Sequence, residues 1–159
     1  MEFEENPLNP TNVSQPGAPV TQLSLFLENR VGALLSVLRL INDTKVEVLG
    51  LSVVDSIDVT IVRMILTDPD PVCTLFIEKG IAFTETHMVV VQLDEGAHGL
   101  ADCLAALLGG ETNMHFSYPL LSRPGGKAAL AMCLEDTDFG ASVLRQAGFK
   151  VLFQDDLSR

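Results

Sequence analysis

The hydrophobic residues from Val20 onward change their spacing in a regular order. Leucines occupy every second position toward the end of residues 21–27, which predicts a strand with one buried face. A turn at residues 28–31 follows, and the next apolar residues fall at i, i+3, i+4 and i+7, the spacing of one helix face. This stripe consists of Leu34, Val37, Leu38 and Ile41. The pattern therefore begins with a strand, a tight turn and an amphipathic helix.

The next segment has the composition of a strand pair followed by a helix and a strand. Residues 46–55 and 59–66 are rich in strand-forming residues and flank a short polar link. Asp68 is followed by proline, a typical helix start, and we expect this helix to end at Gly80. Residues 81–84 begin a further strand. Together with the first strand and helix, these elements give residues 21–84 the order βαββαβ.

The same order recurs in the second half of the chain. Residues 88–93 form a predicted strand, and an amphipathic helix follows it. Two strands are predicted at 113–121 and 127–134, then a helix capped by Asp136, and a last strand at 149–153. The stripe of the first of these helices consists of Leu100, Cys103, Leu104, Leu107 and Leu108.

The two halves match in pattern, although not in letters, at an offset of 67 residues, which indicates an internal repeat. At this offset Gly32 falls on Gly99, and Ile77 falls on Leu144. Each βαββαβ unit predicts an α+β fold, a four-stranded antiparallel sheet with both helices on one face. Each sheet keeps an uncovered face and two edges, so the units could pair edge to edge, pack face to face or meet a second chain.

Residues 1–19 differ from the rest of the chain and hold four of its eight prolines. Such a segment buries too little apolar surface to offset its conformational entropy, so we expect a flexible tail. We assign the first folded unit to residues 20–86 and the second to residues 87–159.

The net charge of −11 bears on the kinds of partner that the chain can bind. Lysines and arginines are scattered singly, and without a basic stripe nucleic acid and anionic membranes are not expected as partners. No apolar run approaches the ~20 residues of a membrane-spanning helix. The acidic start resembles neither a signal nor a transit peptide, so we expect a cytoplasmic location.

The sequence offers little catalytic chemistry. Cys73, Cys103 and Cys133 are odd in number and widely spaced, which excludes a full disulfide framework and the usual zinc spacings. Phosphate-binding loop, dinucleotide-binding and His-Glu-x-x-His motifs are missing. His115 is isolated on the less buried face of a predicted strand, and nothing pairs the acidic residues as acid and base. We expect no enzyme activity, no cofactor and no metal.

The turn after each unit's first strand is the place best suited to a ligand. In residues 27–34 a strand leads directly into a helix, whose first N–H groups and partial positive charge suit a carboxylate. Gly32 lets a ligand approach the backbone closely, and Asn29 could accept a hydrogen bond from an ammonium group. Alternatively, Asn29 is only an N-cap and Gly32 only a packing glycine.

This strand, the turn Asn-Arg-Val-Gly-Ala-Leu and the helix, inside a βαββαβ unit, resemble the ACT domain. The turn of that family usually reads Asp-Arg-Pro-Gly followed by an aliphatic pair. The resemblance covers residues 20–86 well and 87–157 more weakly, and it describes a stand-alone protein of two ferredoxin-like ACT units. The small regulatory subunit of acetolactate synthase is similar too. Asn29 lacks the charge of the usual Asp, and Val31 lacks the rigidity of the usual Pro.

The resemblance implies a regulatory protein, commonly a homodimer, that binds an amino acid between the turn and the second strand of a neighbouring unit. It implies a first site made of Asn29, Arg30, Val31, Gly32, Ala33 and Leu34, with Ser52 and Val53 from the facing strand. It implies a second site made of Glu95, Ala97, His98, Gly99 and Leu100, in which Glu95 or Asp94 could supply the carboxylate that the first copy lacks. If only one turn binds, the first is favoured because its motif is closer to the family pattern.

A second hypothesis is a ligand-independent accessory subunit of an amino-acid biosynthetic enzyme such as acetolactate synthase. Leu35 and Leu40 lie off the stripe of the first helix and would face solvent in a monomer. They indicate a helix-mediated contact, or they are scattered surface leucines, which are common.

Overall fold

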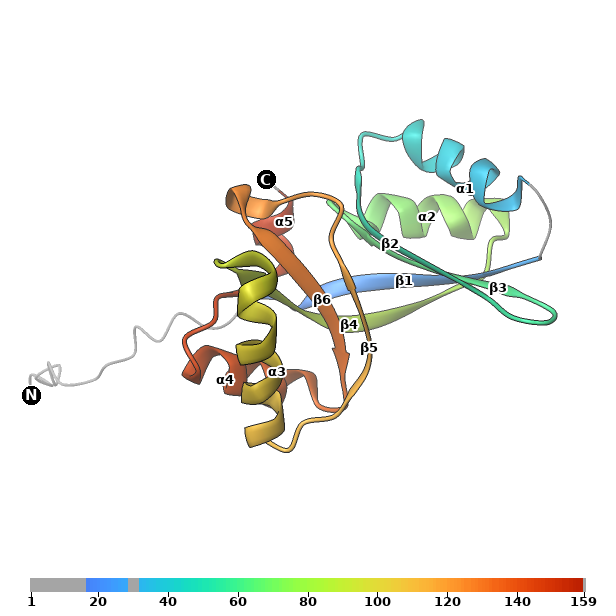
Figure 1. Ribbon diagram of the computed structural model, residues 1–159. Coiled ribbons are helices and arrows are strands. Elements are labelled where there is room, and N and C mark those ends of the chain that lie inside the picture. The colour runs from blue at the N-terminus through green and yellow to red at the C-terminus, as the bar shows by residue number, and fades with distance from the viewer. Residues whose placement is uncertain (1–16, 29–31, 159) are drawn as a thin grey trace, which may run out of the picture.

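The computed structural model describes residues 17–28 and 32–158, and both halves have the predicted βαββαβ order with antiparallel strands (Figure 1). The predicted α+β fold is therefore confirmed. The first half contains β1 (Val20–Leu27), α1 (Ala33–Asn42), β2 (Val48–Asp55), β3 (Thr60–Leu66), α2 (Pro69–Lys79) and β4 (Phe83–Leu93). The second half adds η1 (Gly96–Gly99), α3 (Leu100–Gly109), β5 (Met114–Pro119), η2 (Pro124–Gly126), β6 (Ala128–Leu134), α4 (Thr137–Gln146), β7 (Val151–Leu152) and α5 (Gln154–Leu157).

The strand β4 belongs to both units. The sequence predicted separate strands at 81–84 and 88–93, and this was wrong because the structure has one strand of 11 residues. Its first half pairs with β1 and its second half pairs with β6 and β7. The polar run at 85–87 is compatible with a strand, because this half of β4 pairs on one side only. The predicted boundary between residues 86 and 87 falls inside β4.

The strands form one sheet in the order β2-β3-β1-β4-β6-β5, with β7 beside β4. The two ends of this order meet, because Gly50 on β2 bridges to Leu120, which follows β5. Beside this bridge, the amide of Leu121 donates a 2.7 Å hydrogen bond to the carbonyl of Leu49. The sheet thus curls so that the inner faces of the two units are turned toward each other.

Three apolar cores follow from this arrangement. The helices α1 and α2 cover one face of the first unit's sheet, and α3 and α4 cover one face of the second (Figure 1). A third core lies between the two faces that the helices leave uncovered. It is formed by Val20, Leu49, Ile65, Met88, Val90, Tyr118, Ala129, Ala131, Leu152 and Leu157. The units therefore share a strand and also pack face to face.

The two copies repeat with two different offsets. Val37 and Cys103 are equivalent buried residues 66 positions apart, whereas Phe76 and Leu144 are 68 positions apart. The single offset of 67 relates the N-cap glycines and the bounds of α1 and α3, but it is wrong by one residue for these buried positions. Ile77, which that offset placed on Leu144, is 70% exposed. The link between β5 and β6 is longer than the link between β2 and β3. This extra length changes the offset from 66 to 68 residues.

The helix α3 is rotated relative to its predicted orientation. The stripe was predicted from residue spacing alone, and only part of it is buried. Cys103 and Leu107 are buried, whereas Leu104 is 41% exposed and Leu108 is 79% exposed. The prediction that these two leucines face the core was therefore wrong. On α1, Leu35 is 50% exposed, as predicted from its position off the stripe, whereas Leu40, for which the same was predicted, is half-buried.

The short helix α5 fastens the second unit to the first, and the sequence did not predict it. The side-chain amide of Gln154 donates to the carbonyl of Leu66 at 3.0 Å, and its oxygen accepts from the amide of Thr21 at 3.1 Å. The backbone amide of Gln154 donates to the carbonyl of Ala18 at 3.0 Å. Leu157 is buried in the third core. The C-terminal segment therefore ties the start of β1 to the end of β3.

Within residues 17–28 and 32–158, no helix has the length and apolar character needed to cross a membrane. Across the same residues, His, Cys, Asp and Glu form no group of three or more that could hold a metal ion. All three cysteines are free thiols, with Cys103 buried and Cys73 and Cys133 half-buried.

Candidate functional site

The first predicted turn is described from Gly32 onward, and Asn29, Arg30 and Val31 lie outside the described residues. Gly32 is the N-cap of α1, with a φ of 92° in the left-handed region that favours glycine. No described atom lies within 4 Å of the position that a Cβ would take there. The start of α1 therefore has open space beside its backbone.

The other residues predicted for the first site lie on different surfaces. Ala33 opens α1, and Leu34 packs against the first core. Ser52 lies opposite Arg63 and Val53 opposite Val62, so the two side chains point to opposite faces of β2. Within one chain, the start of α1 lies at the end of the first unit that is remote from β5, the second strand of the other unit (Figure 1).

The second predicted turn joins β4 to α3 through a short 3-10 helix. The amide of His98 donates to the carbonyl of Glu95 at 3.3 Å, which closes this turn. Gly99 is the buried N-cap of α3 and has an ordinary φ of −78°. Ala97 and His98 are exposed, and Leu100 is 37% exposed.

A cavity of 180 Å³ lies beside this second turn. The predicted Glu95 and Gly99 line it, together with Asp94, the alternative to Glu95. Ala97, His98 and Leu100 are not among its lining residues. The full lining consists of Gln92, Asp94, Glu95, Gly99, Asp102, Ala147, Gly148 and Phe149. Two turns therefore enclose the cavity, the one before α3 and the one between α4 and β7.

The sequence reasoning missed Gln92, Asp102 and residues 147–149 of this lining. Residues 147–149 arrive there because β7 pairs with β4, a contact that the sequence alone does not specify. The sequence nonetheless holds two features that could have indicated Gln92 and Asp102. Gln92 is the one polar residue in the apolar run 88–93, and Asp102 is an acidic residue in the first turn of α3.

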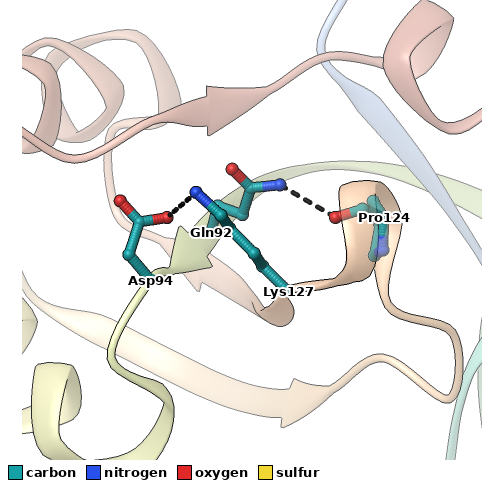
Figure 2. A network of polar contacts seen from close by, with 4 residues as sticks. All are labelled: Gln92, Asp94, Pro124 and Lys127. Atoms are coloured by element: carbon teal, nitrogen blue, oxygen red, sulfur yellow. Dashed lines mark hydrogen bonds and ion pairs between the residues drawn. The ribbon is translucent and has the colours of Figure 1, made fainter.

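A polar network holds the β4 end of the cavity in place (Figure 2). The Lys127 ammonium lies 2.9 Å from an Asp94 carboxylate oxygen, and the Gln92 side-chain amide donates to the Pro124 carbonyl at 2.8 Å. The backbone amide of Gln92 donates to the carbonyl of Lys150 at 2.9 Å. Because Gln92 is 6% exposed, these bonds fix η2 and the start of β7 against β4.

The charges around the cavity favour a cationic group. Lys127 neutralises Asp94, but Glu95 and Asp102 make no salt bridge with any residue in the described part of the chain. Both carboxylates belong to exposed residues, so their field is moderate and screened by salt. An ammonium group that enters the cavity would meet two uncompensated acids.

The starts of the four long helices differ in how they are capped. Side chains of Asp68 and Asp136 cap α2 and α4 by accepting from the amides of Asp70 and Phe139, as predicted for both aspartates. Gly32 and Gly99 precede α1 and α3 and have no side chain for this purpose. Both glycines lie at the predicted turns. At the second turn η1 leads directly into α3, and the amide of Leu100 donates to the carbonyl of Ala97.

Two larger cavities lie elsewhere in the described chain. One of 420 Å³ has a mainly apolar lining that includes Met88, Val89 and Leu152. Another of 340 Å³ lies between the units, next to the loop that holds Arg123. The 340 Å³ cavity also has two acids in its lining, Glu47 and Asp156, but neither of the larger cavities lies at one of the two predicted turns.

The fold is that of two ferredoxin-like βαββαβ units with a ligand-sized cavity at a strand–helix turn. The family model described as "ACT domain pair" matches residues 18–159, and the chain belongs to this family. The resemblance of the first turn to the ACT domain is thereby confirmed. ACT domain pairs are typically regulatory and bind amino acids.

Solved structures support the same fold. Protein BT0572 from Bacteroides thetaiotaomicron is 23% identical, with a TM-score of 0.80 over 89% of this chain and 96% of that one. The ligand-free regulatory subunit of aspartate kinase from Thermus thermophilus is 11% identical, with a TM-score of 0.56 over 82% and 91%. Its counterpart from Thermus flavus is 12% identical, with a TM-score of 0.52 over 82% and 94%. No curated protein matches the sequence.

Proposed function

We propose that this chain is a non-catalytic regulatory protein that binds a small amino acid in the cavity at the second turn. The observation that carries the proposal is the meeting of two carboxylates, Glu95 and Asp102, in one cavity at the strand–helix turn that contains Gly99. The acids attract the α-ammonium group of the ligand. At 180 Å³ the cavity suits a small metabolite better than a drug-sized ligand, which needs about 300–1,000 Å³.

The first turn, residues 29–34, is a second location for the same function. The open space around Gly32 supports it. Because this turn is remote from β5 of its own chain, the facing strand would come from a second copy (Figure 1). A ligand at the first turn would therefore need a second copy of the chain. We also propose a cytoplasmic location, as the sequence predicts.

Thermal-shift screening of the common amino acids at millimolar concentration tests the proposal. A ligand that binds only the folded state stabilises it by about 2.7 kcal/mol at one hundred times its dissociation constant. We expect Asp102→Asn and Glu95→Gln each to weaken binding about tenfold or more, since each removes a charge-assisted hydrogen bond.

The matched control is Asp70→Asn, which removes an acid from the first turn of α2, away from the cavity. It should leave the ligand-induced shift unchanged. If none of the common amino acids produces a shift, or if both cavity variants respond like the wild type, the proposed site is wrong.

The second candidate is a ligand-independent accessory subunit of an amino-acid biosynthetic enzyme such as acetolactate synthase. The fold likeness to a protein named as a regulatory subunit of aspartate kinase and the exposure of Leu35 favour it. Mixing the chain with purified acetolactate synthase catalytic subunit, without any amino acid, tests this role. Co-elution and changed activity would support it, and separate elution would contradict it.

A further inference from the structure

The outer surface of α3 is apolar over its whole length. Leu100, Leu104 and Leu108 form one row along the helix at four-residue spacing, and they are 37%, 41% and 79% exposed. Beside this row runs a second one made only of small residues, Ala101, Ala105 and Gly109, all of them exposed. Rows at four-residue spacing are the ridges and grooves through which helices pack against each other.

The equivalent helix of the first unit shares this character only in part. At the offset of 66 residues that relates buried positions of α1 and α3, Leu108 corresponds to Asn42 and Ala105 to Arg39, whereas Leu104 corresponds to Leu38 and Ala101 to Leu35. The second unit is therefore the more apolar one over the C-terminal half of this face. A helix that is apolar on all sides is normally buried, yet nothing in the described chain covers this side of α3.

The charge of this surface bears on what covers it. The chain carries a net charge of −11, so two copies repel each other over most of their surfaces. Asp102 is the only charged residue among the ten of α3. A second copy meets little repulsion here, and a basic partner finds almost no charge to pair with. The surface is also self-complementary, because a leucine row lies next to a row of small residues.

We infer that two copies of this chain associate through α3, with the leucine row of each helix seated in the alanine–glycine groove of the other. Such packing of identical four-residue rows crosses the helices at about −50°. The contact is isologous, so the same patch serves both copies and the assembly closes as a dimer. Gly99 and Asp102, at the start of α3, line the second-turn cavity, so the dimer contact begins beside the proposed ligand site.

Sedimentation and light scattering of the full chain across a concentration series test this inference. We expect a dimer for the wild type and a monomer for Leu104→Glu and Leu108→Glu, whose buried carboxylates raise the dissociation constant about 100-fold or more. Leu35→Glu on α1 is the matched control, because Leu35 is 50% exposed and lies outside the patch. This control should remain dimeric, and all variants should keep the wild-type circular dichroism.

A second variant distinguishes specific helix packing from nonspecific hydrophobic association. Ala105→Phe adds apolar surface but fills the groove, so it should weaken the dimer, whereas nonspecific hydrophobic association would become stronger. Asp102→Asn and Glu95→Gln, which test ligand binding, should leave the dimer intact. A wild type that stays monomeric at millimolar concentration, or a dimer that survives both glutamate substitutions, would overturn the inference.

Discussion

The hydroxyl of Tyr118 donates a 2.7 Å hydrogen bond to the side-chain oxygen of Gln22, 96 residues earlier in the chain. Gln22 is 1% exposed and Tyr118 is 6% exposed, so the bond lies inside the core between the two units. The side-chain amide of Gln22 in turn donates to the Ser24 hydroxyl at 3.2 Å. A buried polar chain thus fixes β5 of one unit against β1 of the other.

Replacing Tyr118 by Phe should lower the free energy of unfolding by about 1–3 kcal/mol, because the Gln22 oxygen is left without a donor in a buried position. Urea unfolding followed by circular dichroism measures the change. Ser117→Ala, at the adjacent exposed position of β5, is the control and should have little effect. The double variant with Gln22→Leu and Tyr118→Phe should lose less free energy of unfolding than the two single variants lose in sum. Strict additivity of the two losses would contradict a direct coupling.

The stability of the protein should fall at alkaline pH partly through Tyr118. Burial raises the pKa of this phenol, and the nearby Arg63 guanidinium offsets only part of that rise. The unfolded chain therefore loses the proton first, near pH ~10, so this stability is present below that pH and is lost as the pH rises above it. Tyr118→Phe should flatten the alkaline limb of a urea-unfolding pH series, and parallel limbs would show that Tyr118 does not contribute.

The Cys73 thiol should react more slowly than is usual for a half-buried cysteine. Burial, and then a 3.3 Å hydrogen bond to the Glu85 carboxylate, raise its pKa to about 12. Because the thiolate is the reactive form, alkylation by iodoacetamide near neutral pH should be slow. Glu85→Gln should accelerate alkylation of this residue as followed by peptide mass spectrometry, whereas Glu78→Gln on the exposed side of α2 should not. Equal rates in all three proteins would contradict this account of the pKa.

The contacts of α5 should stabilise the joint between the units. Leu157→Ala should lower the free energy of unfolding by about 2–5 kcal/mol, the usual cost of removing a buried leucine side chain. Asp155→Ala, on the exposed side of the same short helix, should change it little. If urea unfolding gives the two variants the same stability, α5 does not hold the units together.

Local signals in the sequence predicted the elements that depend on neighbours along the chain. The Asp68 and Asp136 caps and the Val37–Ile41 face of α1 all follow from short-range chemistry. The break predicted before Met88 failed because pairing with β1 keeps the polar run 85–87 extended. Such pairing is set by the sheet as a whole and leaves no mark in a short window.

The site was predictable only in part for the same reason. Glu95 and Gly99 lie on the turn that the motif indicated, whereas Gly148 and Phe149 reach the cavity through the pairing of β7 with β4. The spacing of apolar residues along α3 fits more than one helix face, so it does not reveal that Cys103 and Leu107 are buried whereas Leu108 is exposed.

A nitrogen–proton NMR titration of the labelled chain with amino acids tests the central claim most directly. The account predicts that a binding amino acid shifts the amide signals of Glu95, Gly99, Asp102 and Gly148, which line one cavity on two separate turns. Signals of the matched α2 turn around Asp70 should not move. Shifts absent from this cavity, or confined to the region of Gly32, would contradict a ligand site at the second turn.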